Sequence, residues 1–121
     1  MDDYKVIFYE DANGNSEITD YFEKISQSKQ KQERATYLKM RHQIQMLKAL
    51  GPMLHTPKKL NGYRYRLWEL RPMPERVFYG IWRKNSFILL NHYTKKKDKT
   101  DPRQVEKALS LLDDWYERNG K

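Results

Sequence analysis

The sequence contains no cysteine, and only five glycines and three histidines occur among its 121 residues. Without cysteine the chain forms neither disulfide bonds nor thiolate zinc sites, and a cysteine nucleophile is excluded. The glycines are too far apart to form a glycine-rich loop around a phosphate. The sequence also lacks any run of about 18 apolar residues, and its acidic first residues differ from a secretory signal. We therefore expect a cytoplasmic protein that does not bind a membrane.

Basic residues are abundant and unevenly distributed. Lysine and arginine number 24 against 16 acidic residues, which gives a formal net charge of +8. Residues 58–103 carry thirteen basic and four acidic residues, whereas residues 1–23 carry one basic and seven acidic residues. A basic half of this kind can bind an anionic polymer, but it is equally typical of a solvated surface that favours solubility. The length fits one domain, residues 1–121, and an aromatic content of 13% argues against disorder.

The spacing of apolar residues predicts a strand and two helices in the first half. The strand covers residues 5–9, where β-branched and aromatic residues precede an Asn-Gly turn. An apolar stripe with helical spacing indicates the first helix: Ile18, Tyr21, Phe22 and Ile25. A second stripe indicates the next helix, which ends at Gly51: Tyr37, Met40, Ile44 and Leu47.

The second half predicts three short strands and a helix. We expect the strands at residues 63–70, 76–82 and 87–93, joined by short turns. Short connections imply antiparallel pairing, so these strands should form a meander. Asp101 is a good N-cap for a last helix, and Pro102 suits its first position. The resulting order is βααβββα, an α+β fold in which an antiparallel sheet packs against helices.

Antiparallel pairing brings several functional side chains to one end of this meander. Arg71 and Arg76 flank the turn between its first two strands, and the third strand returns to the same end at Tyr93 and Lys95. Arginine can bind a phosphate with two parallel hydrogen bonds, and lysine adds mobile positive charge. The rings of His92 and Tyr93 alternate along the strand, so at most one of them points into a shared site.

A site built from cations and phenols suits RNA cleavage without a metal ion or other cofactor. In that reaction the 2′-hydroxyl attacks the adjacent phosphate, while a base removes its proton. Cations stabilise the phosphorane, and an acid protonates the leaving 5′-oxygen. No Ser-His-Asp triad is indicated by order or spacing. The structural alternative is that these cations are solvated and the aromatic rings pack within the sheet.

The order of several short motifs resembles a known family. Lys59-Leu-Asn-Gly62, Leu67-Trp-Glu-Leu-Arg71 and Arg76-Val-Phe-Tyr79 resemble the RelE/ParE superfamily of toxins from type II toxin–antitoxin modules. The segment from Ile88 to Lys96, followed by Lys99-Thr100, resembles the HigB-like, phage-related branch of that superfamily. The resemblance covers roughly residues 55–115, and the RelE-like fold that it implies agrees with the predicted order of elements.

The resemblance implies a ribosome-dependent mRNA endonuclease, an mRNA interferase that inhibits translation. A cognate antitoxin, usually a helix-turn-helix protein, would neutralise it, and a toxin–antitoxin heterotetramer is usual. Arg71 and Arg76 would hold the scissile phosphate. Lys95 is the candidate base, and Tyr93 or His92 is the candidate acid. Further basic residues would bind the backbone of mRNA or ribosomal RNA: Lys59, Arg64, Arg66, Lys96 and Lys99.

Two other functions are open at this point. A ParE-like protein inhibits DNA gyrase on the same fold without cutting nucleic acid, and fold alone does not separate the two activities. A non-catalytic RNA-binding module would show the same positive charge. Arg71, Arg76 and the lysines of residues 95–99 favour cleavage, because a gyrase inhibitor does not need them.

Overall fold

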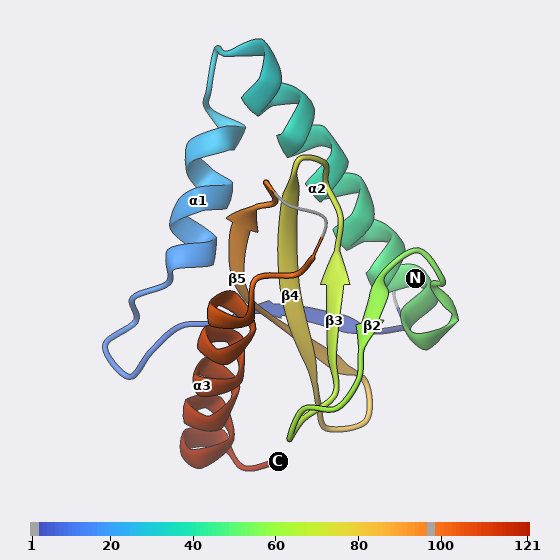
Figure 1. The fold of residues 1–121 in the computed structure, drawn as a ribbon, viewed down its shortest axis with the longest axis vertical. Coiled ribbons are helices and arrows are strands. Elements are labelled where there is room, and N and C mark those ends of the chain that lie inside the picture. Colours follow the sequence, from blue (N-terminus) through green and yellow to red (C-terminus); the bar gives the residue numbers. More distant parts are fainter. Residues whose placement is uncertain (1–2, 97–98) are drawn as a thin grey trace.

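The computed structural model describes residues 3–96 and 99–121 of the protein. In these ranges three helices surround a five-stranded sheet (Figure 1). The elements in chain order are β1 (Lys5–Phe8), α1 (Glu17–Ser26), α2 (Lys31–Leu50), the 3₁₀ turn η1 (Gly51–Met53), β2 (Lys58–Leu60), β3 (Leu67–Leu70), β4 (Glu75–Trp82), β5 (Ser86–Thr94) and α3 (Pro102–Asn119). None of the helices in the described ranges is long and apolar enough to cross a membrane.

The sheet is mixed and has the strand order β1-β5-β4-β3-β2. The pairs β2–β3, β3–β4 and β4–β5 are antiparallel, as the short connections predict. The first strand, β1, instead pairs parallel with β5, which corrects the expectation of a purely antiparallel sheet. Parallel pairing requires a long connection, and the helices α1 and α2 lie within it. The predicted α+β class is confirmed, and the architecture is compatible with the RelE-like fold.

The prediction of a strand over residues 63–70 is wrong in its first half. The short strand β2, which the sequence pattern does not indicate, pairs with β3 so that Leu60 lies opposite Leu67. Residues 61–66 therefore form the connection of a hairpin, and Gly62 has a φ of 89° within it. Arg64 and Arg66 lie in this connection rather than on a strand.

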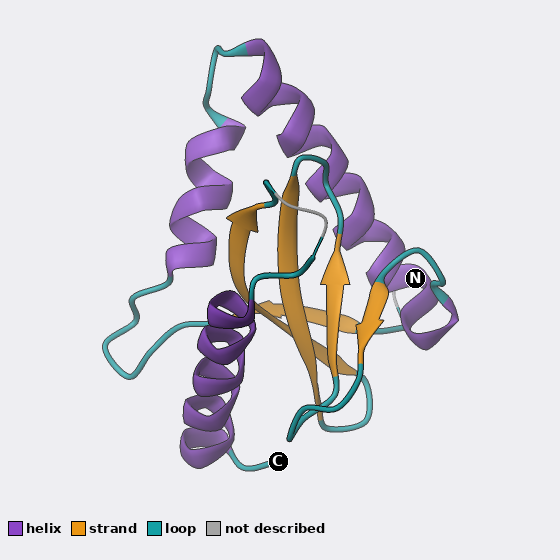
Figure 2. Ribbon diagram, viewed as in Figure 1, coloured by secondary structure: helices purple, strands orange, loops and turns teal. Residues whose placement is uncertain are grey.

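Different helices cover the two faces of the sheet (Figure 2). On one face α3 packs over a core that includes Phe78 and Ile88. On the other face α1 and α2 pack over a core that includes Val77 and Leu89. Successive side chains of a strand point to opposite faces, so two covered faces require the nearly continuous apolar runs of β4 and β5.

The helix α3 is held against the sheet at its start and along its length. Its N-cap is Asp101, as the sequence predicts, and the Asp101 carboxylate accepts a hydrogen bond from the Arg103 amide (2.9 Å). Further along, α3 approaches β4 so closely that a Cβ on Gly80 would lie 2.7 Å from Leu112 Cδ2. The position of the N-terminus of α3 relative to β5 is therefore well defined.

Candidate active site

The turn between β3 and β4 forms one side of the predicted site, and α2 holds it in place. The Gln43 side chain accepts a hydrogen bond from the Arg71 amide (2.9 Å) and donates one to the Arg71 carbonyl (3.0 Å). The Lys39 ammonium donates to the Met73 carbonyl (3.2 Å). These bonds satisfy backbone groups that no strand partner reaches, and they fix the position from which the Arg71 side chain extends.

The ladder between β4 and β5 supplies the other predicted residues. Arg76 and Tyr93 face each other in this ladder. Just beyond it, the Lys95 amide donates to the Pro74 carbonyl (3.2 Å). The structure therefore brings the backbone positions of Arg71, Arg76, Tyr93 and Lys95 to the same end of the sheet.

A β-bulge in β5 decides which aromatic ring lies beside the arginines. Phe78 pairs with Asn91, and Leu90 is left without a partner in the ladder. One extra residue reverses the alternation of side chains beyond it. Tyr93 consequently points to the face covered by α3 and stacks on Phe78, with 5.5 Å between the ring centroids. His92 points to the opposite face.

Arg76 is buried beside a carboxylate that has no contact with solvent. The Glu69 side chain is 0% exposed, and its Oε1 lies 3.0 Å from Nε of Arg76, whose side chain is 8% exposed. The two groups form an ion pair, although the atoms lack the alignment of a hydrogen bond. Nε of Arg71, whose side chain is 42% exposed, lies 3.8 Å from the same Glu69 oxygen. Both predicted phosphate-binding arginines thus gather around one buried anion.

The other guanidinium nitrogens of Arg76 differ in their contacts. Nη1 donates to the Glu75 carbonyl (3.1 Å) and to the Met73 sulfur (3.1 Å). Within residues 3–96 and 99–121, Nη2 donates no hydrogen bond. Glu69 and the turn therefore contact two of the three guanidinium nitrogens, and Nη2 is the remaining donor.

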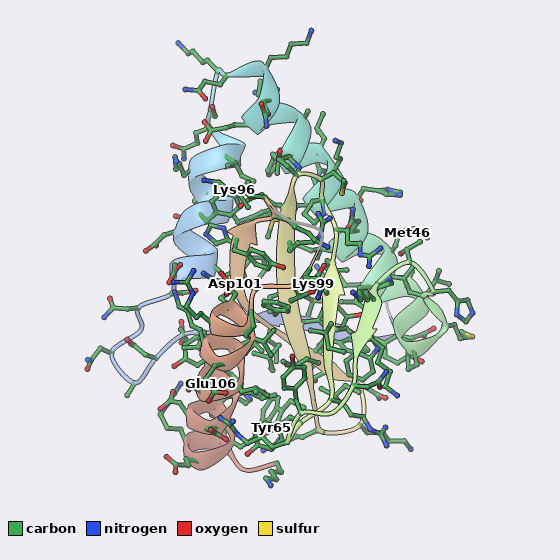
Figure 3. All side chains as sticks on the ribbon, viewed as in Figure 1. Met46, Tyr65, Lys96, Lys99, Asp101 and Glu106 are labelled. Carbon is green, nitrogen blue, oxygen red and sulfur yellow. The ribbon has the colours of Figure 1, made fainter. Side chains whose placement is uncertain are left out.

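A cavity of about 330 Å³ opens between the end of β5 and the start of α3. We call it the cationic pocket, and its lining residues are Tyr93, Thr94, Lys95, Lys96, Lys99, Thr100, Asp101, Pro102 and Arg103. Figure 3 shows Lys96, Lys99 and Asp101 in this region, above the N-terminal end of α3. The lining contains four basic side chains and one acidic one, so the pocket suits an anionic ligand. Lys97, which the predicted lysine run includes, lies outside the described residues.

The phenol of Tyr93 keeps its proton in this environment. Burial raises the pKa of Tyr93, and the negative charge of Glu69 raises it further. The Thr100 hydroxyl, the charge of Arg76 and the Asp101 backbone lower the pKa of Tyr93 without cancelling the increase. The Tyr93 oxygen itself is buried, so the protonated phenol can donate a hydrogen bond or a proton only to an anion that is bound directly against it.

His92 belongs to a separate cluster on the face covered by α1 and α2. Its Nδ1 lies 3.0 Å from Glu75 Oε1, and its ring stacks on Tyr21 with 3.7 Å between the centroids. The Thr94 hydroxyl donates to the second oxygen of Glu75. Burial alone would raise the pKa of Glu75, but the bonds to His92, Thr94 and Tyr21 outweigh burial and lower it. Of the two acid candidates, Tyr93 is therefore the one beside the arginines.

Three of the five predicted RNA-binding residues lie away from the cationic pocket. Arg64 and Arg66 lie before the start of β3, whereas the site lies at its end. Figure 3 shows the neighbouring Tyr65 at this far end of the sheet. Arg64 is paired there with Asp113 (2.5 Å) and with a second acid of α3. Lys59 lies over the ring of Trp68 (6.0 Å), on the face covered by α2. Lys96 and Lys99 line the pocket.

Sequence reasoning missed the two buried carboxylates, Glu69 and Glu75. Each is an acidic residue beside or within an apolar strand, and a carboxylate buried at such a position must be paired. An acidic residue in such an apolar strand could have been used to predict that Glu69 and Glu75 each have a basic or hydrogen-bonding partner. Among the residues that the structure describes, no group of three or more histidine and acidic side chains is placed to hold a metal ion.

A comparison with protein families shows which family the chain resembles. The family model for the phage-derived protein Gp49-like (DUF891) matches residues 20–113. This range runs from α1 into α3 and includes the cationic pocket, Glu69 and both arginines. No curated protein matches the chain.

Proposed function

The chain belongs to the Gp49-like family of phage-derived proteins, a RelE-like toxin family, and on this premise we propose that it is a ribosome-dependent mRNA endonuclease. The family supports the toxin of a toxin–antitoxin module. The cationic pocket, with Tyr93 in its lining and Arg76 opposite Tyr93 in the ladder, is the observation that carries the further step to RNA cleavage. The HigB-like motifs of the sequence also support it. Such a toxin acts in the cytoplasm, where ribosomes translate.

RNA fits the charges of this site. The lysines of the pocket supply mobile positive charge at the end of β5. Arg71 is exposed enough to bind a phosphate with two guanidinium nitrogens. Nη2 of Arg76, which donates no hydrogen bond within the described residues, adds a further donor. Because bound phosphates release counterions, the affinity for RNA should fall steeply as the salt concentration rises.

The proposed reaction is an internal transesterification of RNA. The 2′-oxygen forms a bond to phosphorus, and the bond from phosphorus to the 5′-oxygen breaks. The products are a 2′,3′-cyclic phosphate and a 5′-hydroxyl. Lys95 accepts the proton of the 2′-hydroxyl, and Tyr93 donates a proton to the leaving 5′-oxygen. Arg71 and Arg76 stabilise the negative charge that develops on the phosphorane.

A toxin of this family implies a cognate antitoxin. We expect a helix-turn-helix protein that assembles with the toxin into a heterotetramer. An acidic segment of the antitoxin would be complementary to the cationic pocket, and it would block RNA by occupying the same charges.

Primer extension on mRNA from a translating extract tests the proposed cleavage. The wild-type protein should produce new 5′ ends at in-frame codon positions, and omission of ribosomes should abolish them. Arg71→Ala should reduce cleavage by about 100-fold, because it removes one stabilising donor of the transition state. Arg41→Ala is the matched control, since Arg41 is an exposed arginine of α2 outside the site and its loss changes the net charge equally.

The same assay separates the other candidate functions. Intact mRNA together with arrested growth would contradict cleavage and favour a gyrase inhibitor, which a supercoiling assay would detect. RNA that binds without new 5′ ends would indicate a non-catalytic RNA-binding module. Equal cleavage by Arg71→Ala and the wild type would exclude Arg71 from the site.

A further inference from the structure

We propose that Glu69 is a positioning residue for this cleavage, whose carboxylate holds Arg76 so that Nη2 of the guanidinium is presented to the scissile phosphate. This inference rests on the proposed function. It assigns a role to a buried acid that neither the sequence motifs nor the family match assigns.

Glu69 acts through its neighbours, because it cannot touch RNA. Its side chain is 0% exposed, at the centre of β3 on the face covered by α3. Its Oε1 lies 3.0 Å from Nε of Arg76, and its Oε2 accepts a long hydrogen bond of 3.5 Å from Thr100, which lines the cationic pocket. The carboxylate therefore connects the buried arginine with the wall of the pocket.

Contacts on two different nitrogens restrain the Arg76 guanidinium. Nη1 is held by the turn before β4, and Nε is held by Glu69. Without the carboxylate, only the contacts of Nη1 and the side chain's own covalent link would restrain the guanidinium, and Nη2 would be directed less precisely. Glu69 thus adds a second restraint on the orientation of Arg76, and therefore on the direction of its Nη2 donor.

Stability alone gives a weak reason for a carboxylate at this position. A buried ion pair repays the desolvation of its charges only when its geometry is excellent. Here Glu69 Oε1 and Arg76 Nε lack hydrogen-bond alignment, and both atoms are enclosed. The same charge also favours the protonated form of Tyr93, since Glu69 raises the pKa of that phenol. The orientation of Arg76 and the protonation of Tyr93 would both contribute to RNA cleavage, whereas a misaligned buried ion pair contributes little to the stability of the fold.

The test compares Glu69→Gln with Glu75→Gln in the ribosome cleavage assay. Glu75 is the matched control, because it is a buried, hydrogen-bonded carboxylate at the same end of the sheet on the opposite face. Glu69→Gln should lower the maximal cleavage rate by about 100-fold. The toxin concentration that gives half-maximal cleavage should not change, because Glu69 does not contact RNA. Glu75→Gln should retain the wild-type maximal rate.

Thermal unfolding of each variant is measured first, so that loss of structure is not mistaken for loss of orientation. If Glu69→Gln does not fold, Glu69→Asp takes its place, since it keeps the charge and shortens the side chain by one methylene. This variant should fold and cleave at a reduced maximal rate. The double variant Glu69→Met/Arg76→Met replaces the whole pair by apolar groups, and it should fold without cleaving RNA.

Several results would overturn the inference. A wild-type maximal rate in a folded Glu69 variant would show that orientation does not depend on this carboxylate. An equal loss in Glu69→Gln and Glu75→Gln would assign Glu69 a structural role only. A higher half-maximal concentration at an unchanged maximal rate would place its effect on binding. A wild-type protein that cuts no mRNA would overturn the proposed function, and this role of Glu69 with it.

Discussion

Arg71 and Arg76 are both arginines at the ends of neighbouring strands, and their surroundings differ sharply. The Arg71 side chain is 42% exposed, whereas that of Arg76 is 8% exposed and faces the fully enclosed Glu69. An exposed arginine changes the stability of a protein little when it is removed. A buried arginine leaves an unpaired charge behind. The two residues therefore share a proposed role in phosphate binding and differ in their importance for folding.

Replacement of the two arginines should separate activity from stability. Arg76→Ala should lower the free energy of unfolding by about 3–5 kcal/mol, because Glu69 loses its closest partner. Arg71→Ala should change it by no more than about 0.5 kcal/mol. Denaturant unfolding of both variants measures the difference. An Arg76→Ala variant as stable as the wild type would show that the ion pair does not stabilise the fold.

At the scale of the elements, α3 contributes its first turn to the cationic pocket and lies close against β4 further along. Residues of the N-terminal turn of α3 line the pocket, and the helix continues past Gly80 of β4. Asn91 ties the two layers together where its side-chain amide donates to the Gln104 carbonyl (3.2 Å). The helix can lie this close because glycine has no side chain at the crossing point.

Gly80→Ala should destabilise the protein by about 1–3 kcal/mol, since the added methyl group overlaps Leu112. The substitution does not strain the backbone, because Gly80 is not among the described residues with positive φ. In a Leu112→Ala background the same methyl group occupies vacated space, so Gly80→Ala should cost much less there. A double-mutant cycle on unfolding free energies measures this coupling. Additive effects of the two substitutions would contradict direct contact between these positions.

At the scale of the whole molecule, helices cover both faces of the sheet, and at one end of the sheet each face buries an acidic residue. Glu69 lies under the α3 side and Glu75 under the side of α1 and α2. Additional acids pair with cations around α3, and these interactions lower the pKa of Asp113 and of Asp114. Hydrogen bonds and charge partners in the folded state therefore favour the ionised form of several carboxyl groups.

This arrangement predicts a loss of stability in acid. The pKa of Glu75 is lower in the folded chain than in the unfolded chain, where a glutamate has a pKa of about 4.3. Its contribution is therefore fully present above that pH, and it is lost as the pH falls through the folded value. The melting temperature should decrease below about pH 4.5. The difference in unfolding free energy between the wild type and Glu75→Gln should shrink over the same range. A constant difference would show that Glu75 titrates as it does in the unfolded chain.

The amino-acid sequence by itself determined the order of most elements and the gathering of the proposed site residues at one end of the sheet. Apolar spacing is a local property, so α1, α2, α3 and the strands β1, β4 and β5 follow from it. Short turns force antiparallel neighbours, so Arg71, Arg76, Tyr93 and Lys95 had to meet. The short strand β2 escaped detection, because three residues carry too little periodicity to indicate a strand.

Only the tertiary structure decided which side chains face one another. The bulge at Leu90 reverses the alternation of β5, so Tyr93 lies on the face of Arg76 and His92 lies on the other. The pairing of Arg76 with Glu69 joins two strands, and no spacing along the chain records it. Local sequence specifies backbone periodicity, whereas the face of each side chain depends on register. The partner of each buried charge likewise depends on which side chains become neighbours when the helices pack against the sheet.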